Sequence, residues 1–168
     1  AMVAMVALAC SPAASPTATP TKAPTATAAP PNTSGIQHVF VVVMENHSYN
    51  EVWNTSSSPY ITSLGNAYAR ATNYYAITHP SLPNYLAMIG GDTFGITFDC
   101  YVCLVAAPSL PDEIEASGRT WKDYQESMPG PCALHDTLSY VQKHDPFTWF
   151  TSIRDNTERC KRGVVPLD

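Results

Sequence analysis

One serine in this sequence stands where a helix is expected to begin. Ser81 lies in the segment Thr78-His79-Pro80-Ser81-Leu82-Pro83-Asn84. The apolar spacing that follows, and the Gly90-Gly91 pair after it, predict a helix over about residues 83–90. The N–H groups and the dipole at a helix N-terminus favour an anion. Ser81 is therefore either a helix cap or a nucleophile whose alkoxide and covalent adduct this field stabilises.

A carboxylate and an amide follow an apolar run nearer the N-terminus. The run His38–Met44 is rich in β-branched residues and lacks polar alternation, which predicts a strand buried on both faces of a parallel sheet. Glu45 and Asn46 come directly after it, at the edge where open α/β sheets bind ligands. A carboxylate that leaves a buried strand is costly unless it is paired or binds a metal ion.

Histidines and a lysine could supply protons or bind an anion. His79 lies two residues before Ser81, and His144 lies in the segment Lys143-His144-Asp145-Pro146-Phe147. We expect both histidines to line the site, where an imidazole can donate a proton. Lys143 is expected either to bind the anion as a point charge or to be solvated. His47 is a further candidate, whereas His38 and His135 are expected to be structural or solvated.

Alternating strands and helices must position these side chains. Besides the strand over 38–44, we expect a helix over 59–71 that begins at Ser58-Pro59, a strand over 71–77, a helix over 109–118 and a strand over 119–124. Strands separated by helices indicate an α/β domain. Other acidic residues are expected to be surface charges: Glu113, Glu115, Asp123 and Glu126.

The sequence argues against nucleic-acid binding and against a membrane-spanning segment. The chain of 168 residues has a net charge of −5, so it offers no basic surface to neutralise a run of phosphates, and nucleic acid is not an expected partner. No apolar run reaches the roughly 20 residues that span a bilayer. Lys22 is the single charged residue in positions 1–35.

Those first 35 residues are not expected to fold. Residues 1–9 are small and apolar, as at the end of a secretory signal, and Cys10 resembles the acylated first residue of a bacterial lipoprotein. The alternative is an ordinary signal with an incidental cysteine. Residues 11–35 are mainly Pro, Thr, Ala and Ser, which predicts a disordered tether before a folded part over 36–168. Both alternatives imply export, with membrane contact only through a lipid anchor.

Export determines how the four remaining cysteines are interpreted. Cys100, Cys103, Cys132 and Cys160 are an even set in an oxidising compartment, so two disulfides are expected, with three possible pairings. A zinc site built on Cys100 and Cys103 is the alternative.

Two motifs together resemble the bacterial phosphoesterase family that contains phospholipases C and metal-dependent acid phosphatases. They are Met44-Glu45-Asn46-His47-Ser48-Tyr49 and Thr78-His79-Pro80-Ser81-Leu82-Pro83-Asn84-Tyr85. The resemblance runs from about Ile36 to Asp168, and the segment around His144 shares it. It implies the fold of the alkaline phosphatase superfamily, an α/β sandwich with a central, mostly parallel sheet and flanking helices.

The resemblance also assigns roles to residues of this chain. Ser81 takes the place of the nucleophile that becomes phosphorylated, and Glu45 takes the place of an acidic metal ligand. Asn46 matches an asparagine that accompanies the glutamate at the metal and the phosphate. A divalent metal held by Glu45, Asn46 and Ser81 would lower the pKa of the serine hydroxyl and neutralise developing charge. The implied substrate is a small phosphate ester with Asn46 at the phosphate. We also expect Lys143 to bind that phosphate through its charge, and the protein to be a monomer.

Three functions fit these residues. A phosphomonoesterase of the acid phosphatase type is the main prediction, a phospholipase C acting on phosphodiesters is the first alternative, and an inactive module that binds a phosphorylated ligand is the second. Relatives continue past the position of Asp168 into further metal ligands, so the resemblance implies the N-terminal portion of such an enzyme. Residues 36–168 alone are therefore expected to show weak or no turnover.

Overall fold

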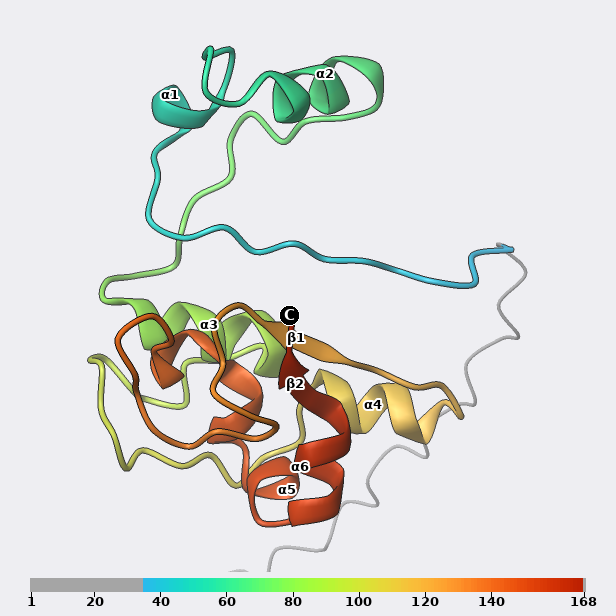
Figure 1. Cartoon of the computed structure of the whole chain (residues 1–168), viewed down its shortest axis with the longest axis vertical. Helices are drawn as coiled ribbons and strands as arrows, with labels where there is room; N and C mark the ends of the chain where they lie inside the picture. Colours follow the sequence, from blue (N-terminus) through green and yellow to red (C-terminus); the bar gives the residue numbers. More distant parts are fainter. Residues whose placement is uncertain (1–34, 168) are drawn as a thin grey trace, which may run out of the picture. The chain divides into compact units, whose positions relative to one another are not determined.

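The computed structural model describes residues 35–167, which divide between Pro59 and Tyr60 into two units that are described separately. Figure 1 shows the helices and strands in their order along the chain. The predictions for the signal remnant, for Cys10 and for the tether up to residue 34 lie outside the described residues.

The first unit contains one short helix and an extended apolar segment. Helix α1 (Tyr49–Val52) begins after Ser48, whose backbone N–H and hydroxyl both donate to the Glu51 carboxylate at 2.7 and 2.8 Å. None of residues 35–45 belongs to a helix or strand, and the side chains of Val39–Met44 are between 50% and 87% exposed. The predicted buried strand over 38–44 is therefore wrong for the described chain.

The predicted strand over 71–77 is also wrong, and one physical reason explains both segments. Tyr74, Tyr75 and Ile77 are exposed, and no strand forms over these residues. A strand of a parallel sheet needs neighbours that complete its hydrogen bonds and layers that cover its faces. Within residues 35–167 the sheet consists of two strands of three residues each, so it gives neither segment a partner.

The predicted helices are present. Helix α2 (Pro59–Ala67) begins at the proline that was expected to start it, and α3 (Ser81–Gly90) ends at Gly91, whose backbone is left-handed. Helix α4 (Leu110–Ala116) begins after Ser109, with a capping box to Asp112. The remaining short elements are η1 (Gln142–His144), η2 (Pro146–Trp149), α5 (Thr151–Arg154) and α6 (Thr157–Gly163). Within residues 35–167, no helix is both long and apolar enough to cross a membrane.

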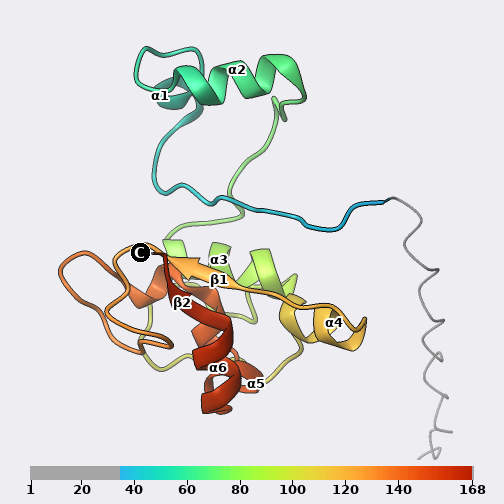
Figure 2. The ribbon, with the colours of Figure 1, turned by 45° about the vertical axis from the view of Figure 1, so that its right-hand side comes forward.

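The two strands form a small parallel sheet in the second unit. β1 (Asp123–Gln125) pairs with β2 (Val164–Pro166), with Asp123 opposite Val164 (Figure 2). The strand predicted over 119–124 overlaps β1 at its last two residues. A separate parallel bridge joins Val105 to Phe150. The described chain is thus a mixed α/β structure, and its core gathers around α3, η2, α5 and β2: Leu82, Leu86, Ile89, Trp149, Phe150, Ile153 and Val164.

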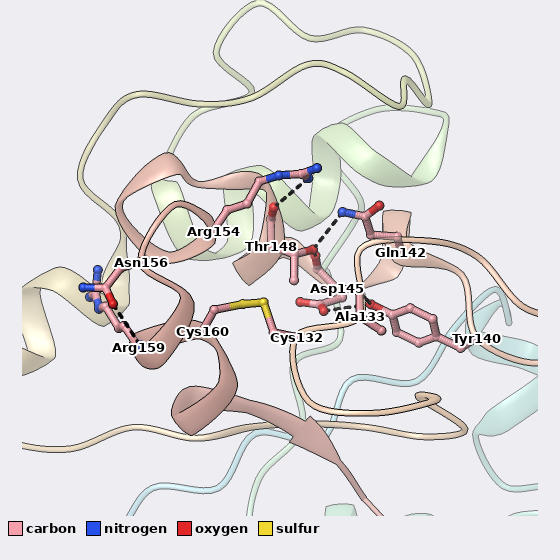
Figure 3. The surroundings of a disulfide bond; sticks show 10 residues. All are labelled: Cys132, Ala133, Tyr140, Gln142, Asp145, Thr148, Arg154, Asn156, Arg159 and Cys160. Atoms are coloured by element: carbon pink, nitrogen blue, oxygen red, sulfur yellow. Dashed lines mark hydrogen bonds between the residues drawn. A yellow bond between two sulfur atoms is a disulfide. The ribbon is translucent and has the colours of Figure 1, made fainter.

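Two disulfides are present, as the cysteine count predicted. Cys100 pairs with Cys103, and Cys132 pairs with Cys160, which joins the loop after β1 to helix α6 (Figure 3). The alternative of a zinc site on Cys100 and Cys103 is wrong, because their sulfurs are bonded to each other and are not thiolate ligands.

Gly163 allows α6 to end against an indole ring. A Cβ atom at Gly163 would lie 2.2–2.7 Å from ring atoms of Trp121. That ring is held on two sides, because it stacks on Phe147 with centroids 5.3 Å apart and donates from Nε1 to Glu115 at 2.7 Å. We expect Gly163→Ala to lower the free energy of unfolding in urea by about 1–3 kcal/mol. Gly130→Ala is the matched control, since a Cβ there meets nothing within 4 Å; equal loss in both variants would contradict the steric argument.

Candidate functional site

The turn that precedes α3 is fixed by one side chain. Asn84 Oδ1 accepts hydrogen bonds from the backbone N–H groups of Ile77 and Thr78 at 2.9 and 3.1 Å, and Nδ2 donates to the carbonyls of Thr78 and Pro80 at 2.7 and 2.8 Å. These four bonds satisfy the backbone of a loop that has no strand to pair with. They place Ser81 at the first position of a ten-residue helix, where its partly buried hydroxyl lies in the field of the helix N-terminus.

A carboxylate from a distant loop reaches the same helix end. Asp99 Oδ1 accepts the backbone N–H of Leu82 at 3.0 Å, and Oδ2 accepts from the ammonium of Lys143 at 2.7 Å. Partial burial opposes ionisation of Asp99, but the Leu82 amide and the Lys143 ammonium outweigh it, so the pKa of Asp99 lies below its usual range. We call these three groups, Asp99, the Leu82 amide and Lys143, the Asp99 bridge.

Helix η1 brings two predicted site residues to α3. Lys143 reaches the N-terminal turn of α3 through the Asp99 bridge, and the ring of His144 stacks on Tyr85 of α3, with centroids 5.2 Å apart and planes 23° apart. His79 lies in the turn before Ser81 with an exposed side chain. The second unit therefore contains Ser81, His79, Lys143 and His144, and places Lys143 and His144 against the helix that Ser81 begins.

The other predicted ligands lie in the first unit. Glu45 and Asn46 are exposed, and Asn46 has a left-handed backbone with φ of 56°. His47 lies 4.0 Å from Glu51, and His38 is exposed in the extended segment. His135 lies in an exposed loop of the second unit, as predicted. Because the units are described separately, the grouping of Glu45 and Asn46 with Ser81 stays a prediction.

The donor types of the predicted metal site suit a hard divalent cation. Glu45 offers carboxylate oxygens, Asn46 an amide oxygen and Ser81 a hydroxyl, and these are the ligands that such ions prefer. Among residues 35–167, no three His, Cys, Asp or Glu side chains come together in a way that could hold a metal ion. Glu45, Asn46 and Ser81 thus have donor atoms that suit such an ion, but they are fewer ligands than a complete site needs.

A carboxyl pair, in which Asp145 is buried and Asp123 is partly buried, is a feature that the sequence analysis missed. Asp145 is fully buried, and it accepts a hydrogen bond from the Tyr140 hydroxyl at 2.9 Å (Figure 3). Its second partner is the Asp123 carboxyl of β1. Burial raises the pKa of Asp123 to about 6, and burial together with the neighbouring Asp123 carboxylate raises the pKa of Asp145 well above its usual range. Asp123 was predicted to be a surface charge, and that prediction is wrong.

Glu115 is exposed, as predicted for a surface charge, and it belongs to an ion-pair cluster. The guanidinium of Arg159 contacts Asp112 at 2.8 Å and Glu115 at 3.1 Å. Its side chain is only 9% exposed, and the group lies 5.9 Å from the centroid of the Trp121 ring. These contacts join α4 to α6, so Glu115 is a surface charge that also links two helices.

Sequence signals for the missed residues differ. Asp145 follows His144 and precedes Pro146 in a polar segment, so nothing local marks it as buried. Asp99 stands next to Cys100, and a cysteine expected to form a disulfide indicates a fixed loop. That neighbourhood is the one signal that could have singled out Asp99.

Comparison with known proteins finds a family match over the part of the chain that contains the Ser81 turn. The model of the phosphoesterase family matches residues 51–164, a range that includes Ser81, Asp99, Lys143 and His144 and begins after Glu45 and Asn46. An acid phosphatase from Aspergillus fumigatus is 32% identical over 142 residues, which is 78% of this chain and 31% of that protein. A phosphatidylinositol-3-phosphatase from Mycobacterium tuberculosis is 37% identical over 121 residues, which is 69% of this chain and 40% of that protein.

A third relative is similar over a shorter region. A phosphate-repressible acid phosphatase from Penicillium chrysogenum is 40% identical over 98 residues, covering 54% of this chain and 24% of that protein. The chain thus spans between about a quarter and two fifths of these relatives. Comparison with solved structures gives no significant match. Since the family model matches well over half of the chain, and does so across the helix that begins at Ser81, the chain belongs to the phosphoesterase family.

Proposed function

We propose that the protein that carries this chain is a metal-dependent phosphoesterase of the acid phosphatase type, which hydrolyses phosphate monoesters through Ser81. The observation that carries the proposal is the match to the phosphoesterase family across the Ser81 turn. Relatives named as acid phosphatases support the monoester, and so does the relative named as a phosphatidylinositol-3-phosphatase, whose name specifies a monoester phosphate.

The proposed reaction uses Ser81 as the nucleophile. The Ser81 hydroxyl releases its proton to solvent, and Oγ forms a bond to phosphorus while the bond from phosphorus to the leaving oxygen breaks. His79 or His144 gives the leaving oxygen a proton and is later reprotonated from solvent. Water then attacks the phosphoserine, which releases phosphate and returns the hydroxyl of Ser81. Lys143, Asn46 and the first turn of α3 attract the anionic oxygens, which otherwise repel a nucleophile.

A divalent metal is part of this proposal. Glu45, Asn46 and Ser81 would hold it, and when bound it supplies a Lewis acid that lowers the pKa of the serine hydroxyl and neutralises charge on the phosphate. The proposal further includes an alkaline-phosphatase-like sandwich with a central, mostly parallel sheet. In that fold, Glu45 and Asn46 would lie at the edge of the sheet at which ligands bind.

The proposed location is outside the cytoplasm. The two disulfides support export, because such bonds persist in oxidising compartments. After export, the protein would either stay at the cell surface through an acyl chain on Cys10 or be secreted after cleavage of the signal. We propose that the protein acts as a monomer on a small phosphate ester.

Metal removal tests the proposal. We expect the protein produced from its complete gene to hydrolyse p-nitrophenyl phosphate, to lose this activity by roughly a hundredfold or more after dialysis against EDTA, and to regain it with one divalent cation. Release of p-nitrophenolate measures the rate. The same preparation should hydrolyse bis(p-nitrophenyl) phosphate and phosphatidylcholine much more slowly.

Each other outcome favours a different function. Faster cleavage of the diesters would replace the proposal with the phospholipase C alternative. Binding of inorganic phosphate without turnover of any ester would favour the inactive binding module. Full activity in the presence of EDTA would contradict the proposed dependence on a divalent metal.

A further inference from the structure

Lys143 is attached to the start of helix α3 through a single carboxylate. In the Asp99 bridge, one oxygen of Asp99 accepts the Leu82 amide at 3.0 Å and the other accepts the Lys143 ammonium at 2.7 Å. Leu82 directly follows Ser81, the first residue of the helix. Since both bonds end on the same carboxyl group, the ammonium is held beside the turn that carries the proposed nucleophile.

A phosphate must be able to reach the ammonium while Asp99 holds it. The side chain of Lys143 is 35% exposed and that of Asp99 is 26% exposed, so the bridge is accessible from solvent. A lysine that is already held loses less side-chain entropy when it binds a phosphate than one that is mobile.

The loop that carries Asp99 is itself held in place. Asp99 is followed by Cys100, which is buried and bonded to Cys103. Asp99 also interacts electrostatically with His144, the second residue that η1 brings to α3. Its charge thus acts on three groups at one helix end: the Leu82 amide, Lys143 and His144.

We propose that Asp99 is a positioning residue that holds the Lys143 ammonium beside Ser81, so that Lys143 contacts the phosphoryl group as it is transferred. The inference rests on the proposed function and adds a residue to it. Asp99 does not touch the substrate; it acts through Lys143. The charge of Asp99 also balances that of Lys143 before substrate arrives, so the empty site does not carry an unpaired cation.

A double-mutant cycle tests this role in the protein produced from its complete gene. We expect Asp99→Asn and Lys143→Met each to lower kcat/KM for p-nitrophenyl phosphate by roughly 10–100-fold, the range expected for loss of a charged hydrogen bond. The amide of Asp99→Asn still accepts from Leu82 but no longer pairs with the ammonium. Because Asp99 acts through Lys143, the double variant should be no slower than Lys143→Met alone.

The control is Asp92→Asn on the same loop. Asp92 accepts the backbone N–H of Phe94 at 3.1 Å and is exposed, so this variant should keep the wild-type rate. A second measurement does not depend on activity. Acetylation of lysines, read by mass spectrometry, should modify Lys143 several-fold faster in Asp99→Asn than in wild type, with Lys161 as internal reference.

The outcomes separate the inference from the proposed function. Additive losses in the double variant, or unchanged acetylation of Lys143, would overturn the positioning role while the wild type remains active. If the wild type hydrolyses no phosphate ester, the proposed function fails and the positioning role fails with it. If Asp99→Asn loses its near-ultraviolet circular dichroism while Asp92→Asn keeps it, Asp99 holds the fold and the proposal is also wrong.

Discussion

Replacement of Ser81 by alanine is expected to lower the rate of phosphate monoester hydrolysis by roughly a thousandfold or more. Ser81 is the single hydroxyl in the first turn of α3, and no neighbouring side chain of that turn can form the phosphoserine in its place. Alanine is a good helix former, so the variant should unfold at the same urea concentration as the wild type. Release of p-nitrophenolate under saturating metal measures the loss.

A chemical trap strengthens this prediction. Acid quenching during turnover of a 32P-labelled monoester should leave label on the peptide that contains Ser81 in the wild type, and none in Ser81→Ala. Ser63→Ala is the matched control, because Ser63 also lies on a helix and bonds only to the carbonyl of Tyr60 at 2.7 Å. Residual activity within tenfold of the wild type would show that Ser81 is only a helix-terminal residue.

The second large effect concerns the carboxyl pair formed by the partly buried Asp123 and the buried Asp145. The folded state raises the pKa of Asp123 from 3.8 to about 6 and raises that of Asp145 as well. Between about pH 4 and pH 6 the folded protein therefore binds more protons than the unfolded chain, so the free energy of unfolding falls as pH rises through this window. We expect a loss on the order of 2 kcal/mol between about pH 4 and pH 7.

Asp145→Asn should remove most of this slope. Its amide can donate to Asp123 and thereby stabilise the ionised carboxylate, so Asp123 would titrate closer to its ordinary range. Urea unfolding of wild type and variant at each pH cancels the contribution of groups that both share. Asp155→Asn is the control, since Asp155 is exposed at the end of α5. A slope that persists unchanged in Asp145→Asn would contradict the coupling of the two carboxyl groups, and a gain of stability with Ca²⁺ near pH 7 would indicate a cation between the carboxylates.

Local signals were sufficient for the helices. Ser58-Pro59, Ser109 with Asp112, and Gly91 act within four residues of the helix ends that they define, so the sequence alone located α2, α3 and α4. The strands depend on partners elsewhere. The runs 38–44 and 71–77 have the composition of buried strands, yet in the described chain no neighbouring strands cover them.

The site residues likewise divide into those marked by local sequence and those that depend on distant contacts. Ser81 was predicted because proline, serine and the apolar spacing near it are all local. Asp99 lies 17 residues from Leu82 and 44 from Lys143 along the chain, and no short motif encodes contacts of that range. The pair Asp123 and Asp145 was missed because acidic residues are seldom buried, and the two residues lie 22 positions apart along the chain.

The exposed run Val39–Met44 has a consequence for the tendency of the chain to aggregate. Six consecutive apolar residues, four of them valine, without charge, glycine or proline, are the composition of segments that stack into cross-β fibrils. The property that suits this run to the centre of a sheet also makes it a template for intermolecular pairing whenever its faces are open to water. Solubility of the polypeptide thus depends on whether this one segment is covered.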